Sequence, residues 1–374
     1  MSDPKDLYRE ATTKEWPLKV ELTIDRHTVY HKERDLKYGT NPGQAAAVFN
    51  PHGNTPLFIE VKTGKGGPSQ TNYEDIDRAL RIHRSLDTMT DNPAVVIMKH
   101  VNPSGVGKNS DLFCAFKDAW DCDARAAYGG TVAFNKPVTE KFLREVYRHI
   151  RARDAATFID VMVAPKVSPD ALEFMQKKEA IRIFTYEPSR LAAIDPFSTG
   201  APEIKRLMDG RIIVSDPYTE QVKGPLMAPD KFVCVTNMKP TQGQINPLLF
   251  AWYVCANTRS NAVVLAKETE NGAGLKTVAI GTGKQERIAS IDEAIAKAQV
   301  KAICVGEDPA NILQGAVLAS DGFIPNIDNL LPLHEKGVRA IISPGGSKFD
   351  DAIINACNEY GIAMVFTKAR CFTH

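Results

Sequence analysis

The adjacent pair Lys99-His100 is the part of the sequence best suited to moving a proton. It follows a compact apolar run at 94–98 and precedes the turn-forming string V-N-P-S-G-V-G at 101–107. An ammonium beside an imidazole disfavours protonation of the ring, so His100 would stay neutral and able to accept a proton near pH 7. Strand ends in α/β proteins often carry ligand-binding residues, because the sheet anchors the loops there. On spacing alone, an ordinary surface Lys-His pair is the better fit.

Other loops combine glycine with cations or polar groups. The string L-K-Y-G-T-N-P-G-Q at 36–44 places a cation and an aromatic in a dense turn. The string S-P-G-G-S at 343–347 lies between an apolar run and a helical pattern, which suits an anion or a polar ligand edge. The string G-T-G-K-Q-E-R at 281–287 would let Arg287 approach a ligand. Each string also fits a plain turn, and Arg370 lies in a tail that also fits a frayed end.

Patterns typical of ATP, dinucleotide and zinc sites fail at defined positions. The string at 103–110 lacks the first glycine of a P-loop, because position 102 is Asn102. Glu286 stands where a dinucleotide loop needs its third glycine. His27 and His31 are four apart, but their surroundings favour an extended chain, in which such residues lie roughly 13 Å from each other. We therefore expect neither ATP nor zinc. The zinc deaminase signature, H-x-E with a later P-C-x-x-C, is missing as well.

The composition favours no nucleic-acid or membrane partner and is compatible with a small anionic substrate. Among 374 residues, 46 Lys+Arg balance 45 Asp+Glu for a net charge of +1, which gives no electrostatic case for binding nucleic acid or a membrane. No apolar stretch is long enough for a transmembrane helix, and the polar N-terminus has no signal-peptide core. The seven scattered cysteines form no C-x-x-C. We therefore expect a reduced, cytoplasmic setting.

Short apolar runs alternate with helical periodicity, which predicts an α/β fold. We expect a buried strand at 94–98 and amphipathic helices at 74–86 and 139–152. Three pairs of strings recur in the same order, which predicts a duplicated α/β unit. The pairs are AVVIMK (94–99) with AVVLAK (262–267), AAYGGTVAF (126–134) with LASDGFIPN (318–326), and VMVAP (161–165) with AIISP (340–344). In the second pair Gly130 is matched to Gly322. Prolines crowd at 215–240, where we expect the junction.

Together these strings resemble the transformylase portion of the bifunctional purine-biosynthesis proteins that join AICAR transformylase to IMP cyclohydrolase. The matching strings, in family order, are L-K-Y-G-T-N-P-G-Q, V-I-M-K-H-V-N-P-S-G, R-S-N-A-V-V-L-A-K, A-I-G-T-G-K-Q-E-R-I, A-S-D-G-F-I-P, I-S-P-G-G-S and R-C-F-T-H. The resemblance implies two tandem cytidine-deaminase-like α/β units without zinc. We place an N-terminal extension at 1–20 and the two transformylase subdomains at 21–225 and 226–374.

The resemblance implies formyl transfer from 10-formyltetrahydrofolate to the 5-amino group of AICAR, giving FAICAR and tetrahydrofolate in purine biosynthesis. His100 would be the general base, Lys99 would stabilise the transition state, and Asn261 would hold the AICAR carboxamide. The residues implied to contact AICAR are Lys37, Tyr38, His100, Gly129, Asp160, Asn261, Arg287 and Arg370. Those implied on the folate side are Ile288, Phe323, Asp328, Ser347 and Lys348. Some family members hold a buried monovalent cation, which makes K+ a candidate near Val254, Thr258, Ser260 and Asp321.

This chain departs from the family pattern in several places. Lys37 stands where the family usually has Arg, so a bidentate phosphate clamp becomes a point charge. Gly43 replaces a common His, and Asn326 replaces a common aromatic on the folate side. The cyclohydrolase domain that the resemblance leads one to expect before the transformylase is absent from this sequence, so we expect a separate IMP cyclohydrolase. The resemblance also implies a homodimer with active sites at its interface.

Three other interpretations remain open from the residues. An AICAR formyltransferase that uses formate and ATP would need a nucleotide site. A non-catalytic protein that binds purine intermediates would have no need of a general base, so Lys99, His100 and Asn261 argue against it. A zinc-dependent deaminase would be excluded by a measurement showing no stoichiometric zinc.

Overall fold

The computed structural model describes residues 14–24, 27–153, 158–198, 200–223 and 232–374. Within these residues twelve strands form one mixed sheet. Those of the first half are β4 (Phe58–Lys62), β5 (Ala94–Lys99), β6 (Asn102–Asn109), β7 (Thr131–Phe134), β8 (Val161–Ala164) and β9 (Arg182–Tyr186). Those of the second half are β12 (Val233–Cys234), β13 (Val263–Glu268), β14 (Gly274–Gly281), β15 (Val317–Ser320), β16 (Ala340–Ser343) and β17 (Ala363–Phe366). The predicted α/β class is confirmed.

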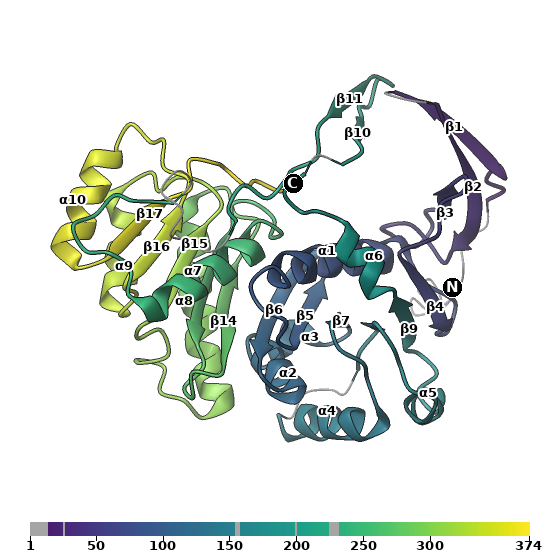
Figure 1. Ribbon diagram of the computed structural model, residues 1–374, viewed down its shortest axis with the longest axis horizontal. Coiled ribbons are helices and arrows are strands. Elements are labelled where there is room, and N and C mark those ends of the chain that lie inside the picture. The colour runs from purple at the N-terminus through teal and green to yellow at the C-terminus, as the bar shows by residue number, and fades with distance from the viewer. Residues whose placement is uncertain (1–13, 25–26, 154–157, 199, 224–231) are drawn as a thin grey trace, which may run out of the picture.

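Helices cover both faces of this sheet (Figure 1). The first half contributes α1 (Gln70–Leu86), α2 (Leu112–Trp120), α3 (Ala124–Ala127), α4 (Glu140–Ala152), α5 (Pro169–Gln176) and α6 (Pro188–Ala193). The second half contributes α7 (Gln242–Cys255), α8 (Arg287–Val305), α9 (Leu331–Glu335) and α10 (Asp350–Tyr360), with a 3-10 turn at Ile327–Asn329. None of the helices in the described ranges has the length and apolar character needed to cross a membrane.

The strand order is β12-β17-β16-β15-β13-β14-β6-β5-β7-β8-β9-β4. β5 pairs antiparallel with β6 and β7, and β13 pairs antiparallel with β14 and β15. The runs β7-β8-β9 and β15-β16-β17 are parallel, and each ends in an antiparallel edge strand, β4 or β12. The two halves meet at β6 and β14, which pair antiparallel at the centre of the sheet.

The repeated strings fall on this pattern with one exception. AVVIMK and AVVLAK lie on β5 and β13, and VMVAP and AIISP lie on β8 and β16. The middle match is wrong in register, because Gly130 precedes β7 whereas Gly322 follows β15. Part of the expected junction, including the 225/226 boundary, lies outside the described residues.

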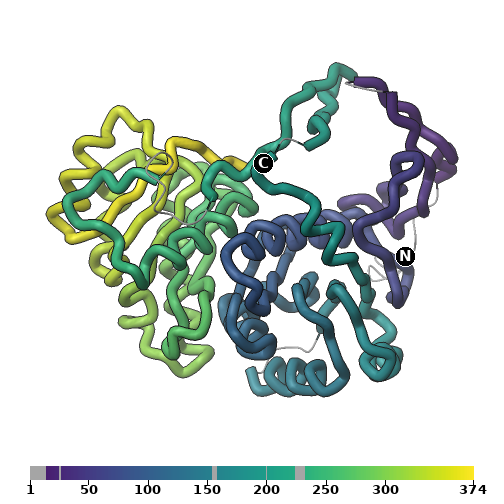
Figure 2. The backbone as a smooth tube through the Cα atoms, viewed as in Figure 1, coloured from purple at the N-terminus to yellow at the C-terminus, as the bar shows by residue number. Residues whose placement is uncertain are grey.

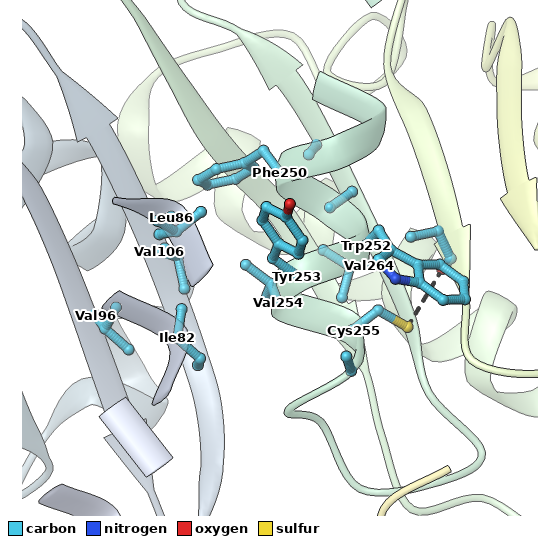
Figure 3. Close-up of a cluster of buried hydrophobic side chains, with 14 of the residues drawn as sticks. Ile82, Leu86, Val96, Val106, Phe250, Trp252, Tyr253, Val254, Cys255 and Val264 are labelled. Carbon is cyan, nitrogen blue, oxygen red and sulfur yellow. Dashed lines mark hydrogen bonds between the residues drawn. The ribbon is translucent and has the colours of Figure 1, made fainter. Parts of the chain in front are cut away.

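One hydrophobic core is continuous across both halves on the face covered by α1 and α7. The C-terminal two thirds of α7 is buried on every side, as expected for a helix that is apolar all round. Figure 3 shows Phe250 and Tyr253 of α7 facing Leu86 of α1 and Val106 of β6. On the opposite face each half has its own core, under α2, α4 and α5 in the first half and under α8 and α10 in the second.

The two predicted helices form, and their caps explain where they begin. α1 starts four residues before the expected 74–86, because Ser69 and Asn72 form a capping box. The Ser69 hydroxyl accepts from the Asn72 amide at 3.3 Å, and the Asn72 side chain accepts from the Ser69 amide at 2.9 Å. α4 begins directly after Thr139, whose hydroxyl accepts from the Phe142 amide.

Two small sheets project from the body (Figures 1 and 2). One is three-stranded and consists of β1 (Lys19–Thr23), β2 (His27–Leu36) and β3 (Ala46–Pro51). The other is the hairpin of β10 (Glu203–Arg206) and β11 (Ile212–Ser215), whose residues are all exposed. His27 and His31 both lie on β2, so the expected extended chain is confirmed there.

Candidate active site

Lys99 ends β5, and His100 forms the turn into β6. The turn lies two residues before the expected Asn102-Pro103, since Asn102 already belongs to β6. His100 and Val101 both have left-handed backbone, with φ of 54° and 63°. For a β-branched residue such as Val101 this conformation is an outlier. A residue held in such a conformation costs of the order of 1–3 kcal/mol of folding free energy, and it persists only where its surroundings hold it. Surrounding contacts must therefore maintain the turn.

Two features of the surroundings favour the neutral form of the His100 ring. Partial burial lowers the pKa of the imidazole, and the Lys99 ammonium lowers it further. The direction agrees with the expectation from the neighbouring cation, although burial is the larger cause. A neutral imidazole can accept a proton, which is the state that a general base requires.

The Lys99 ammonium lies in a cradle of backbone carbonyls. Its Nζ donates to the carbonyl oxygens of Tyr128 at 2.9 Å and of Gly129 at 2.8 Å. Gly129 has a φ of 64°, and a Cβ there would lie 3.1 Å from the Lys99 Nζ. An ammonium carries three N–H donors, so these two bonds leave one for a ligand. The next residue, Gly130, accepts from the Asp160 amide at 3.1 Å, which brings Asp160 beside this segment.

A buried carboxylate supports the turn from the side of α1. The Asp75 side chain, 4% exposed, accepts from the Val101 amide at 2.7 Å through Oδ1 and from the Thr131 hydroxyl at 3.2 Å through Oδ2. Burial raises the pKa of the Asp75 carboxyl to about 6.

Asp160 and Lys37 lie in one charged cluster of the first half. The Asp160 carboxylate accepts from Arg182 at 2.5 Å and from the Asn72 side chain at 2.9 Å. Lys37 is buried, and this burial together with the nearby Arg182 lowers the pKa of its ammonium. The Lys37 Nζ lies 5.5 Å from the centre of the Tyr38 ring. Lys37, Tyr38, Gly129, Asp160 and Lys99 are therefore brought together by the fold.

Asn261 and Arg287 lie in a pocket of about 470 Å³ in the second half. The pocket is lined by Asn261, Gln285, Glu286, Arg287, Ile288, Gly322, Phe323, Pro325, Asn326, Asp328, Asn329 and Phe372. Five of the residues implied by the resemblance thus meet here. Neither Lys99 nor His100 lines this pocket.

The amide of Asn261 is fixed at both ends. Its oxygen accepts from Arg287 at 2.9 Å, and its nitrogen donates to the carbonyl oxygen of Gln285 at 2.8 Å. Arg287 also donates to the Ala262 carbonyl oxygen at 2.8 Å and to the carboxylate of Asp321. The Arg287 Nε is buried without a hydrogen-bond partner among the described residues. In this structure Arg287 orients Asn261.

The C-terminal tail forms part of the pocket wall. The Arg370 guanidinium lies 4.5 Å from the centre of the Phe372 ring, which lines the pocket. The Thr373 amide donates to the Ser260 hydroxyl at 3.1 Å, and the Ser260 amide donates to the Thr373 carbonyl oxygen at 2.9 Å. Cys371, between Arg370 and Phe372 in the sequence, is fully buried. The frayed-end interpretation of Arg370 is therefore wrong.

Ser347 and Lys348 do not line this pocket and belong to the loop between β16 and α10. The Ser347 hydroxyl accepts from the Phe349 amide at 3.1 Å, and the Lys348 Nζ lies 4.9 Å from the Phe349 ring centre. Their contact with folate stays a prediction.

One side chain joins the turn of the first half to the pocket of the second. The Asn102 side-chain oxygen accepts from the Arg259 amide at 3.0 Å and from the Thr282 hydroxyl at 2.9 Å. Asn102 lies two residues after His100, and Arg259 lies two residues before Asn261. The turn and the pocket thus flank the same junction between β6 and β14.

Comparison with known proteins identifies the family. The sequence model of the family described as AICARFT/IMPCHase bienzyme matches residues 7–297, more than three quarters of the chain. The chain belongs to this family. It is 36% identical to the bifunctional purine biosynthesis protein PurH of Roseobacter denitrificans over 340 residues, 91% of this chain and 59% of that protein. It is 33% identical to PurH of Oceanobacillus iheyensis over 354 residues, 92% of this chain and 60% of that protein. The chain spans about three fifths of the length of these relatives.

In this AICARFT/IMPCHase chain the residues implied near a monovalent cation lie close together. The Thr258 hydroxyl donates to the Val254 carbonyl oxygen at 2.8 Å, and the Ser260 hydroxyl donates to the Asp321 carboxylate at 2.5 Å. Asp321 is fully buried, and Arg287 supplies positive charge beside it. None of these four residues leaves a buried side-chain oxygen without a partner. Across the described ranges, no cluster of three or more His, Cys, Asp or Glu could hold a metal ion.

Several residues that hold this candidate site were missed from the sequence. Asn72 and Asp75 support Asp160 and the His100 turn, Arg182 pairs with Asp160, and Phe372 lines the pocket. Asn72 and Asp75 are three residues apart, so they lie on one face of α1, next to the buried Ile76. The sequence signal that could have identified Asn72 and Asp75 is their position as polar residues at the edge of the apolar face of this helix.

Proposed function

We propose that this chain transfers a formyl group from 10-formyltetrahydrofolate to the 5-amino group of AICAR, giving FAICAR and tetrahydrofolate. The observation that carries the proposal is the Lys99-His100 turn, placed beside the Asn261 pocket by the contact of Asn102 with Arg259. Membership of the AICARFT/IMPCHase family supports the same activity.

His100 acts as the general base. The AICAR amine is conjugated with its imidazole ring and carboxamide, so its lone pair attacks the formyl carbon poorly. Loss of the amine proton to the His100 ring as the new C–N bond forms removes this barrier. The lowered pKa of His100 supports the neutral ring that the step requires.

Lys99 offsets the charge that develops on the formyl oxygen. Its two bonds to the carbonyls of Tyr128 and Gly129 fix the ammonium and leave one N–H for the oxyanion. One such preorganised donor is commonly worth roughly 3–4 kcal/mol in a site that excludes water. The tetrahedral intermediate then collapses as the bond from the formyl carbon to the folate nitrogen breaks. The electron pair stays on that nitrogen, which regains a proton from His100 or Lys99.

The remaining site residues bind and orient the two substrates. Asn261 holds the AICAR carboxamide, because Arg287 and Gln285 have already set the plane of its amide. AICAR, with its ribose and phosphate, is contacted by Lys37, Tyr38, Gly129, Asp160, Arg287 and Arg370. The folate is contacted by Ile288, Phe323, Asp328, Ser347 and Lys348. Holding two substrates face to face supplies much of the remaining rate.

The working assembly is a cytoplasmic homodimer of chains built from two cytidine-deaminase-like units. The matched strand pairings of the two halves support the duplication. A homodimer with active sites at its interface is what the family resemblance implies. K+ near Asp321 and an IMP cyclohydrolase activity that uses FAICAR belong to the same proposal.

The test is release of tetrahydrofolate that depends on AICAR. Purified protein with 10-formyltetrahydrofolate and AICAR is expected to give equal amounts of FAICAR and tetrahydrofolate, and omission of AICAR should abolish both. Formation of FAICAR only with formate and ATP would assign the other donor. Calorimetric binding of AICAR without product from either donor would assign a non-catalytic binding protein.

A further inference from the structure

Asp75 is a buried carboxylate that lies behind the catalytic turn without reaching the surface. It extends from α1 and is 4% exposed. Its two oxygens accept hydrogen bonds from two different segments, the turn after β5 and the start of β7. A carboxylate buried in this way needs such partners, because a charge without them is strongly disfavoured in a protein interior.

The first oxygen acts on the turn that carries His100. Val101 has a φ of 63°, which its branched side chain disfavours, and the preceding His100 has a φ of 54°. The bond from the Val101 amide to Asp75 Oδ1, at 2.7 Å, ties this unfavourable turn to a rigid helix. Without it, the turn has less to oppose relaxation, and the His100 ring would move with the backbone.

The second oxygen acts on the segment that holds Lys99. Thr131 begins β7 and donates its hydroxyl to Asp75 Oδ2 at 3.2 Å. Two and three residues earlier, the carbonyls of Gly129 and Tyr128 accept from the Lys99 ammonium. One side chain therefore ties together the His100 turn and the Lys99 cradle.

We infer that Asp75 is the positioning residue of this site, setting the distance and angle between His100 and Lys99. The inference rests on the proposed function, and it concerns geometry: Asp75 acts through the two segments that it holds. Burial raises the pKa of the Asp75 carboxyl to about 6, against the hydrogen bonds from Val101 and Thr131, which lower it. Of the charged groups nearby, Lys99 lowers this pKa and Asp160 raises it.

Two substitutions separate geometry from charge. Asp75→Asn keeps the shape, since the amide oxygen can accept from Val101 while the amide nitrogen donates to the Thr131 hydroxyl. Asp75→Glu keeps the charge but moves both oxygens by one methylene. Asp75→Ala removes both bonds. Asp77→Ala, on the same helix with a side chain 55% exposed, is the matched control.

For a positioning residue, kcat should fall in the order wild type, Asp75→Asn, Asp75→Glu, Asp75→Ala. We expect Asp75→Asn and Asp77→Ala to stay near wild type, and Asp75→Ala to lose about 100-fold in kcat, the scale of a misplaced catalytic group. The KM for AICAR should change little, and in Asp75→Glu the acid limb of the pH–rate profile should shift toward the ordinary pKa of histidine. An active Asp75→Glu with an inactive Asp75→Asn would overturn the inference.

Hydrogen–deuterium exchange tests the same inference without activity. The amide of Val101 should be protected in wild type, Asp75→Asn and Asp77→Ala, and should exchange faster in Asp75→Glu. Unchanged protection in Asp75→Glu would refute the positioning role whatever the reaction is. Faster exchange in Asp75→Glu, together with no formyl transfer by the wild-type protein, would retain the positioning role and refute the proposed function.

Discussion

The Arg287 guanidinium donates a hydrogen bond to the side-chain oxygen of Asn261 at 2.9 Å. The first residue of α8 therefore fixes the orientation of the amide that lines the pocket. The same guanidinium pairs with the fully buried Asp321. Positioning at this site and stability of the second half therefore depend on one side chain.

Arg287→Ala should lower the free energy of unfolding by roughly 3–5 kcal/mol, because it leaves the Asp321 carboxylate buried without its partner. Urea denaturation measures the loss. Arg211→Ala removes a pair whose arginine is 77% exposed and serves as the control. It should cost at most about 1 kcal/mol. Equal losses in the free energy of unfolding would show that the buried pair contributes no more to stability than the exposed one.

His100→Ala should abolish tetrahydrofolate release while leaving AICAR binding by calorimetry largely intact, because in the proposed mechanism the ring removes a proton and does little to hold substrate. His52→Ala, an exposed histidine after β3, should keep full activity. Turnover near wild type in His100→Ala would rule out its assignment as base.

Lys99→Arg should retain part of kcat, and Lys99→Ala should lose most of it. A guanidinium keeps the charge and can still donate to the carbonyls of Tyr128 and Gly129, whereas alanine leaves both carbonyls without their cation. Steady-state kinetics on both variants measures the difference. Wild-type rates in both would assign the oxyanion to another group.

Gly129→Ala should lower kcat, since the added Cβ would lie 3.1 Å from the Lys99 Nζ. Gly272→Ala is matched in backbone, with a φ of 66° against 64°, but its Cβ would meet nothing within 4 Å. Both should lose about 1–2 kcal/mol of stability from the left-handed backbone. Only the first should lose activity, and a similar loss in the second would remove the steric explanation.

Ionisation of the buried Glu220 should lower the free energy of unfolding as pH rises from 4.5 to about 7. Burial raises the pKa of this carboxyl from 4.5 to about 7, although Trp252 donates to it at 2.8 Å. Because its folded pKa is the higher one, ionisation costs folding free energy above pH 4.5, up to roughly 3 kcal/mol above pH 7. Glu220→Gln should therefore be more stable than wild type at pH 8 and equal to it near pH 4. Denaturant titrations at both values decide this, with the exposed Glu359→Gln as the control.

Local patterns predicted the elements well where periodicity and caps agree. The strand at 94–98 and the helix after Thr139 follow directly from their apolar spacing. The turn was misplaced because Asn102-Pro103 is a strong turn signal. In the structure Pro103 sits in β6 opposite Met98, where the register shifts between Ile97 and Met98, and such an irregularity is a place where a strand tolerates proline.

The assembled site depended on information that spacing does not contain. Asn261, Arg287 and Phe372 meet in one pocket from segments far apart in the chain, and only the family resemblance had grouped the first two. Nothing in the spacing distinguishes Asp75 from the other acids of its helix. Its partner, the Val101 amide, is known only from the structure, in which Val101 has a left-handed backbone.

The central pairing of β6 with β14 restricts how substrates can enter. Backbone hydrogen bonds link 107–109 to 274–276, the Thr277 hydroxyl bonds to both backbone groups of Val106, and the core behind them is shared. A hinge motion that separated the two halves would break these hydrogen bonds. In the proposed reaction the two substrates would therefore enter through the loops that surround the sheet, while β6 and β14 stay paired.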